Sequence, residues 1–397
     1  MITHPARLVL VAYTRFGARG HKGTPTYYLV REAWKRGYVH QVIAVSKSLC
    51  QYEFDLQLVD TFPGESRLTS SLSKIKEKVW AGFPSRWLGE VIFDRYAAAK
   101  LPRQGGILVT TPRLAQTAQT ARGLGYRILL YAGQAHPGYL LKQIQAENDT
   151  FGLKSAKQHR SRAWEMARFA AHIASSDYIL TISDFAKDTY VQSGFPREKI
   201  FVAPLGVDLR RFQATPPVEN SFTCLFVAHV AGAIAVLKGL PYLLQAWSEL
   251  GLQNAQLLVC GKMGPEAQEL IQRSAGKLST VEFLGPVSDP EIYYRKASVF
   301  VFPSIAEGFG KVVLEAMASG RPVITTPVPK PVVREGLDGF YVAPRDVEAL
   351  KDRILYFYQH PEEVRRMGAN ASEQAHRFTW ERFSGQVADI VEEVAAA

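Results

Sequence analysis

Short apolar runs, separated by polar segments of helical length, recur along the whole chain. Runs of this size are too short for free-standing helices and are typical of strands buried on both faces. The expected strands of the first half are residues 7–13, 41–46, 107–110, 128–131, 178–182 and 200–203. Those of the second half are residues 223–228, 256–260, 281–284, 299–302, 323–325 and 340–342. This alternation predicts an α/β fold in which parallel sheets are covered by helices on both faces.

Capping residues mark several of the helices between these strands. A helix is expected over 25–36 before Gly37, and another over 240–250. Ser183 is a plausible N-cap for a helix that Gly194 stops. The acid after it, Asp184, fits favourable first-turn charge better than a catalytic base.

The most informative stretch is EGFGKVVLEAMASGRPVI, residues 307–324. It joins a buried strand to a helix through a glycine turn, and a helix start of this kind offers N–H groups to an anion. Glu307 and Glu315 frame the turn, and a carboxylate accepts sugar hydroxyls well. Two acids at this spacing suit a nucleotide-sugar. The alternative is that Glu307 is a solvated loop acid and Glu315 pairs with Lys311.

Taken whole, this stretch resembles the signature of the family-four retaining glycosyltransferases, which have the GT-B fold. The resemblance implies two Rossmann-like domains facing each other across a cleft. An N-terminal acceptor domain would span 1–204 and a donor domain 205–378, joined near the VAPLGVD run, with a last helix in 379–397 crossing back to the first domain. It also implies that Glu307 binds donor-sugar hydroxyls and Glu315 the ribose. The backbone of Gly308, Phe309 and Gly310 would lie against the donor.

Other positions match the family's phosphate contacts less uniformly. Lys238 precedes a glycine and opens a helix, as expected of a residue that contacts the diphosphate. The family's arginine is replaced by His229, which would hold a diphosphate less firmly. Lys311 and Arg321 are candidates to compensate for this exchange. Two further positions match loops that touch the phosphates and base: Gly261 and Val287.

The first half carries weaker signals. His136 follows a strand and resembles the family histidine that reaches toward the donor sugar, although a lone histidine is as readily structural. A glycine-rich loop between the first strand and first helix would border the acceptor, or be an ordinary surface turn; its glycines are Gly17, Gly20 and Gly23.

Composition limits the alternatives. The chain has 397 residues, 47% hydrophobic and 21% charged, which is typical of a globular protein of about two domains. Cys50, Cys224 and Cys260 show no metal-ligand spacing and are expected to be reduced and mostly buried. No signal peptide or membrane span is evident, so a cytoplasmic protein is expected.

Charge is uneven along the chain. Residues 1–204 hold 28 Lys and Arg against 15 Asp and Glu, a net +13, whereas residues 205–397 are at −3. No nucleic-acid motif accompanies this charge. In the segment 67–103, Lys74, Lys76 and Lys78 lie close to Trp80 and Phe83, a composition typical of a membrane interface. An amphipathic helix packed on the sheet is the alternative.

Together with these observations, the resemblance implies a retaining, metal-independent, cofactor-free enzyme that moves a sugar from a nucleoside-diphosphate sugar to a glycan or lipid-linked acceptor. Peripheral attachment to the inner face of an anionic membrane is a further hypothesis. The alternative is a catalytically weak nucleotide-sugar-binding partner of a larger assembly.

Overall fold

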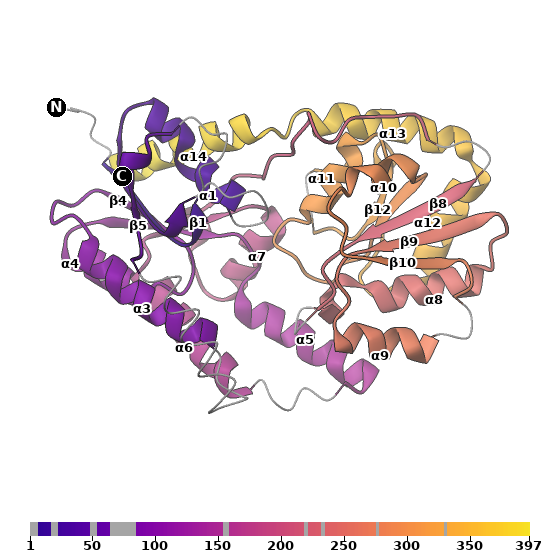
Figure 1. The fold of residues 1–397 in the computed structure, drawn as a ribbon, viewed down its shortest axis with the longest axis horizontal. Helices are drawn as coiled ribbons and strands as arrows, with labels where there is room; N and C mark the ends of the chain where they lie inside the picture. The colour runs from indigo at the N-terminus through magenta and orange to yellow at the C-terminus, as the bar shows by residue number, and fades with distance from the viewer. Residues whose placement is uncertain are drawn as a thin grey trace.

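The computed structural model describes residues 7–16, 23–47, 54–63, 85–153, 159–217, 221–231, 235–274, 278–328 and 332–397. The chain forms two lobes, each built on one parallel sheet (Figure 1). The first sheet contains β1 (Leu8–Phe16), β2 (Val39–Lys47), β3 (Val59–Thr61), β4 (Ile107–Thr110), β5 (Arg127–Ala132), β6 (Tyr178–Thr181) and β7 (Ile200–Val202), in the order β3-β2-β1-β4-β5-β6-β7. Every strand predicted in the first half is present, and β3 was not predicted.

The second sheet contains β8 (Phe222–Val227), β9 (Ala255–Cys260), β10 (Val281–Gly285), β11 (Val299–Phe302), β12 (Val323–Thr325) and β13 (Gly339–Tyr341). Their order is β10-β9-β8-β11-β12-β13, and all pairs are parallel. The strands predicted for this half are all confirmed. The central strand β11 is entirely buried, which explains its unbroken apolar run.

Helices cover both sheets. The first lobe carries α1 (Gly23–Lys35), α3 (Ser85–Lys100), α4 (Ala115–Gly123), α5 (Pro137–Phe151), α6 (His159–Ser175) and α7 (Asp184–Gln192), with short η1 (Leu56–Leu58) and η2 (Arg197–Lys199). The second lobe carries η3 (Ala235–Lys238), α8 (Leu240–Leu250), α9 (Pro265–Ser274), α10 (Glu291–Lys296), α11 (Lys311–Ala318), α12 (Val347–Gln359) and α13 (Pro361–Ala375). Ser183 caps α7 by accepting a hydrogen bond from the Ala186 N–H (3.1 Å), which confirms the predicted N-cap.

The last helix, α14 (Trp380–Ala396), returns to the first lobe, as predicted (Figure 1). Trp380 stacks on Tyr28 of α1 with ring centroids 5.0 Å apart, and Arg36 pairs with Glu392 at 2.9 Å. Near the start of α14 the chain runs beside the linker, where the Val207 N–H donates to the Phe378 carbonyl (3.0 Å). The division at residues 204 and 205 stays a prediction.

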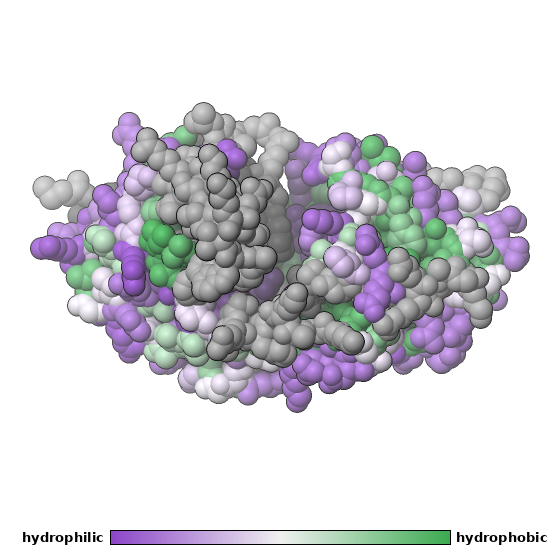
Figure 2. Space-filling model, turned by 60° about the horizontal axis from the view of Figure 1, so that its bottom comes forward, coloured by the Kyte–Doolittle hydropathy of each residue, from purple (hydrophilic) through white to green (hydrophobic). Residues whose placement is uncertain are grey.

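The described surface is largely polar. In the view of Figure 2, hydrophilic residues in purple cover much of the described surface of both lobes, and green areas interrupt them. Among the described residues, the large hydrophobic side chains that are exposed are Phe283, Ile292 and Leu337, which come from separate elements. In the described ranges, no helix combines the length and the apolar character that crossing a bilayer requires.

Candidate functional site

The chain order of the second sheet reverses between β8 and β11. After β8 the chain adds β9 and β10 on one side, and then β11, β12 and β13 on the other. Loops leaving the carboxyl ends of β8 and β11 therefore diverge, and ligands of open parallel sheets bind in the crevice at such a point. His229 and Lys238 follow β8, whereas Glu307 follows β11. The topology thus brings three of the predicted residues to one edge.

Hydrogen bonds join these two loops. The Leu237 carbonyl accepts from the Ser304 hydroxyl (2.9 Å) and from the Ile305 N–H (2.8 Å). The next residue, Lys238, consequently lies beside Glu307, and their side chains form an ion pair although they are 69 residues apart in sequence. The Lys238 side chain is 13% exposed and that of Glu307 is 18% exposed, so the pair is shielded from bulk solvent without being sealed off.

Glycines permit both helix starts at this edge. Gly239 before α8 and Gly310 before α11 adopt left-handed φ angles of 72° and 73°. A Cβ atom on Gly239 would lie 2.0 Å from the Pro303 carbonyl oxygen, so only glycine fits there. Neither helix has a side-chain cap. Their first N–H groups are therefore suited to an anion such as a diphosphate.

Glu315 lies on the buried side of α11. Lys311 Nζ contacts its Oε1 at 3.1 Å, and the Tyr294 hydroxyl donates to its Oε2 at 3.3 Å. Burial first, and then the charge of Glu315, raise the pKa of Tyr294 well above its ordinary value, so this phenol stays protonated. The Lys311 pair that the sequence left open is therefore present, and the ribose role of Glu315 stays a prediction. Tyr294 was not predicted, because no pattern linked α10 to the acid.

Arg321 is not available to a phosphate, and the hypothesis that it compensates for His229 is wrong. Its side chain is fully buried, and it donates to the carbonyls of Ala297 (2.8 Å) and Ser319 (3.2 Å). Burial lowers its pKa to about 10. The guanidinium therefore holds the ends of α10 and α11 in place. Lys311, with a side chain 30% exposed, is the remaining candidate of the two.

The other predicted donor contacts lie on loops of the same edge. His229 is exposed after β8, and Val287 is half-buried after β10. Gly261 has φ of 128°, and a Cβ there would lie 1.7 Å from the Ala228 carbonyl oxygen. Its N–H donates to the Gly285 carbonyl (2.8 Å), which ties the ends of β9 and β10 together. Gly261 thus has a structural role as well as the predicted one.

The first lobe closes against the loop that carries Glu307. A Cβ atom on Gly308 would lie 2.4 Å from the Gly133 carbonyl oxygen, in the turn between β5 and α5. The Ser183 hydroxyl at the start of α7 donates to the Gly308 carbonyl. Phe309 is buried. The predicted motif therefore sits at the contact between the lobes, and neither Ser183 nor Gly133 was predicted to touch it.

His136 is the N-cap of α5, beside this contact. Its side-chain Nδ1 accepts a hydrogen bond from the Gly138 N–H (3.2 Å). The backbone N–H of His136 donates to the Thr189 hydroxyl (2.9 Å). Burial lowers the pKa of the imidazole, so the ring is neutral near pH 7 and carries its proton on Nε2. The structural role left open by the sequence is present, and the catalytic role stays a prediction.

A second contact between the lobes is centred on Glu147 of α5, which is fully buried. It accepts hydrogen bonds from the Tyr242 hydroxyl of α8 (3.0 Å) and from Arg345 Nε (2.6 Å). Arg345 also donates to Gln143 (2.8 Å). We call these four residues the α5 clasp. No local pattern in the sequence indicates the α5 clasp, because its members are spread over more than 200 positions.

Several predicted positions cannot be placed at the site. Gly17 and Gly20 lie outside the described residues. Gly23 is the first residue of α1, which corrects its placement in the loop, and its acceptor-side role stays a prediction. Cys224 and Cys260 are free and buried, as predicted, and Cys50 lies outside the described residues. The lysines of the proposed membrane segment also lie outside them.

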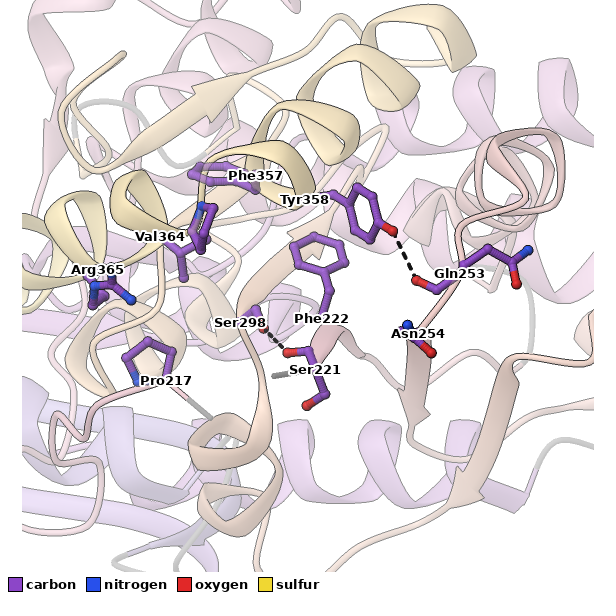
Figure 3. A pocket seen from close by; sticks show the side chains of 11 residues that line it. Pro217, Ser221, Phe222, Gln253, Asn254, Ser298, Phe357, Tyr358, Val364 and Arg365 are labelled. Atoms are coloured by element: carbon purple, nitrogen blue, oxygen red, sulfur yellow. Dashed lines mark hydrogen bonds between the residues drawn. The ribbon is translucent and has the colours of Figure 1, made fainter. Parts of the chain in front are cut away.

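One cavity, of about 480 Å³, lies away from this site (Figure 3). Its lining residues stand at the amino ends of the second sheet and on α12 and α13: Pro217, Ser221, Phe222, Gln253, Asn254, Ser298, Phe357, Tyr358, Pro361, Val364 and Arg365. Tyr358 donates to the Gln253 carbonyl (3.1 Å), and Arg365 is the one charged side chain of this lining. Ligands of parallel sheets bind at the opposite, carboxyl edge, so we do not assign the candidate chemistry to this cavity.

Comparison with known families decides the assignment of the second lobe. A family model described as group 1 glycosyl transferases matches residues 222–360. Residues 222–360 belong to the group 1 glycosyltransferases. This glycosyltransferase domain contains Lys238, Glu307 and Glu315.

The match to a curated relative extends beyond the domain. An MMP α-(1→4)-mannosyltransferase from Mycolicibacterium hassiacum is 30% identical over 227 residues, which are 55% of this chain and 54% of that protein. The chain thus spans about half the length of the curated relative it matches.

Solved structures resemble the whole chain. A sucrose-phosphate synthase from Thermosynechococcus elongatus gives a TM-score of 0.67 at 20% identity, covering 98% of this chain and 99% of that one. HepE from Anabaena, solved with UDP-glucose, gives 0.63 at 16% identity, covering 97% and 99%. At such identities the likeness shows the fold, and the group 1 glycosyltransferase domain is the second lobe of a GT-B architecture.

Proposed function

We propose that this chain transfers a sugar from a nucleoside-diphosphate sugar to an acceptor hydroxyl, with retention of the anomeric configuration, in the synthesis of a polysaccharide, glycolipid or other glycoconjugate. The observation that carries the proposal is the pairing of Lys238 with Glu307 at the switch point of the glycosyltransferase domain. A group for phosphate and a group for sugar hydroxyls lie side by side there. The first lobe contacts the same loop at Gly308.

The proposed roles follow from the chemistry of each group. Lys238 and the N-termini of α8 and α11 stabilise the charge on the departing diphosphate, which grows in the transition state. Glu307 accepts from sugar hydroxyls, and Glu315 accepts from the ribose. His136 offers a neutral N–H donor from the first lobe.

The acceptor proton needs a destination in this reaction. We propose that it passes to the departing phosphate on the same face of the sugar, so that no protein group forms a covalent intermediate. The protein then acts by positioning the two substrates and by electrostatic stabilisation. Metal independence and peripheral attachment to an anionic membrane belong to the same proposal.

The names of two similar proteins bear on the class of donor. HepE was solved with UDP-glucose, and the Mycolicibacterium relative is named a mannosyltransferase. The first supports a nucleotide-sugar as the donor of this chain, and the second supports sugar transfer as its reaction. The candidate donors are UDP-, GDP- and ADP-linked sugars.

The test is to incubate the purified protein with UDP-, GDP- and ADP-linked sugars and to follow slow donor hydrolysis by proton NMR. We expect one donor to be consumed and the released sugar to appear first in the anomeric configuration of the donor. Release of the opposite anomer would refute retention. Failure to bind any of the three nucleotides would refute the proposed function.

His229 favours a second candidate function. An exposed imidazole in place of guanidinium offers a weaker phosphate contact, and Lys238 is itself engaged by Glu307. The chain would then be a nucleotide-sugar-binding partner with little turnover. Calorimetric binding of a nucleotide-sugar without hydrolysis, and without transfer to an acceptor extract, would identify this case.

A further inference from the structure

Both acids of the glycosyltransferase motif are paired with lysines, but in different ways. Glu307 pairs with Lys238, which is its side-chain partner within the described part of the chain. Glu315 pairs with Lys311 and also accepts from the neutral hydroxyl of Tyr294. Glu315 therefore keeps a second donor nearby if Lys311 turns away, a hydroxyl whose single proton is shared between Glu315 (3.3 Å) and the Val312 carbonyl (3.2 Å). Glu307 has no such second donor among the described residues.

This difference matters because the donor and the leaving nucleotide carry different groups. The intact donor brings both phosphates for Lys238 and sugar hydroxyls for Glu307, so both members of the pair exchange one partner for another. A nucleoside diphosphate brings phosphates but no sugar. If it draws Lys238 away, the Glu307 carboxylate stays behind with 18% of its side chain exposed and without the one side-chain partner that the described residues give it. Leaving a shielded charge without a partner is unfavourable.

From this contrast we infer that the Glu307–Lys238 ion pair is a specificity device: it makes the site favour the intact nucleotide-sugar over the nucleoside diphosphate and so speeds product release. The inference rests on the proposed function. It adds a role to Glu307 that is exercised when the sugar is gone. The ribose is present in both ligands, so the Glu315–Lys311 pair provides no such discrimination.

The test measures calorimetric binding of UDP, GDP and ADP to the wild-type chain and to Glu307→Gln, which keeps the size of the side chain and removes its charge. For the nucleotide that binds the wild type, we expect Glu307→Gln to bind about tenfold more tightly, since Lys238 no longer has to leave a carboxylate. Binding of the matching nucleotide-sugar should weaken in the same variant. The ratio of the two affinities therefore moves strongly toward the nucleotide.

Glu249→Gln is the matched control. It removes the same charge from another glutamate paired with a lysine, Lys351 at 3.0 Å, at the far end of α8. We expect its nucleotide affinity to equal that of the wild type. If Glu307→Gln does not fold, as judged by its melting temperature, Glu307→Ala serves for the same comparison.

A double-mutant cycle separates the ion pair from simple repulsion between Glu307 and the phosphates. In a Lys238→Met background, Glu307→Gln should change nucleotide affinity by less than about twofold, because the pair no longer exists. The same tenfold gain there would overturn the inference in favour of repulsion. An unchanged or weaker affinity of Glu307→Gln in the native background would also overturn it, while leaving the proposed function intact. Binding of none of the three nucleotides by the wild type would overturn both.

Discussion

We expect the α5 clasp to stabilise the contact between the two lobes. Glu147 of the first lobe is fully buried and accepts from Tyr242 and Arg345 of the second. We expect Glu147→Gln to loosen this contact. A glutamine has nearly the same volume, but only its oxygen accepts, so its amide group meets one of the two donors without an acceptor.

The free energy lost in Glu147→Gln can be judged from the burial of the two charged partners. Breaking a fully buried ion pair costs about 3–5 kcal/mol. The Arg345 side chain is 37% exposed and regains water, so we expect a smaller loss of about 2 kcal/mol. A loss of that size shifts the ratio of closed to open forms about 30-fold. Tyr242→Phe removes one hydrogen bond to the charged carboxylate and should cost about 1.5 kcal/mol.

Two measurements test this expectation. Urea unfolding should show the midpoint of Glu147→Gln shifted to lower denaturant, and small-angle X-ray scattering should show a larger radius of gyration in the absence of ligand. Because α5 is capped by His136 and follows the turn that touches Gly308, a saturating nucleotide should restore part of the compact form.

Asp149→Asn provides the control for the clasp. It removes the same charge from the same helix, at an exposed position that contacts Gln145 (2.7 Å). Its unfolding free energy should stay within about 0.5 kcal/mol of the wild type. An equal effect for Asp149→Asn, or a Glu147→Gln protein as stable and as compact as the wild type, would refute the reasoning.

Four further predictions concern catalysis and attachment. Lys238→Ala should slow transfer by roughly 10²–10³, and near-normal turnover would contradict its role. Gly308→Ala should separate the lobes and suppress transfer, since its Cβ meets the Gly133 carbonyl, whereas Gly385→Ala on α14 meets nothing within 4 Å and should leave activity unchanged. Transfer should persist in EDTA, and a strict requirement for added manganese would contradict the metal-free mechanism. Liposome flotation should show binding to anionic vesicles at low salt, which Gln at positions 74, 76 and 78 abolishes; binding that survives this change would count against the membrane hypothesis.

Patterns that depend on burial along one short segment were predictable from the sequence. Strands β4, β11 and β12 begin and end where their apolar runs do, and so does α8 between Gly239 and Gly251. Strand β3 escaped prediction because only one of its three residues is buried, which leaves no apolar run to recognise. Its place at the edge of the sheet explains that pattern.

The same distinction between local and distant contacts applies to the residues of the site. The acids Glu307 and Glu315 could be singled out because they belong to one local motif that also contains its glycines, and their binding roles stay predictions. Arg321 belongs to that motif too, but its assignment failed because sequence shows a cation without showing that backbone carbonyls already surround it. A cationic side chain is a phosphate ligand only if solvent and ligand can reach it.

The rest of the site depends on contacts between residues that are far apart in the sequence, and no local pattern indicates such contacts. Ser183 was predicted only as a helix cap, yet its hydroxyl also donates to the Gly308 carbonyl 125 residues away. Both bonds use the same oxygen, because a hydroxyl donates once and accepts at its lone pairs. The start of α7 and the loop that carries Glu307 are therefore fixed to each other by one atom. A single residue that satisfies a helix end in one lobe thereby sets where the motif of the other lobe lies, which is why the site is complete only when the lobes are together.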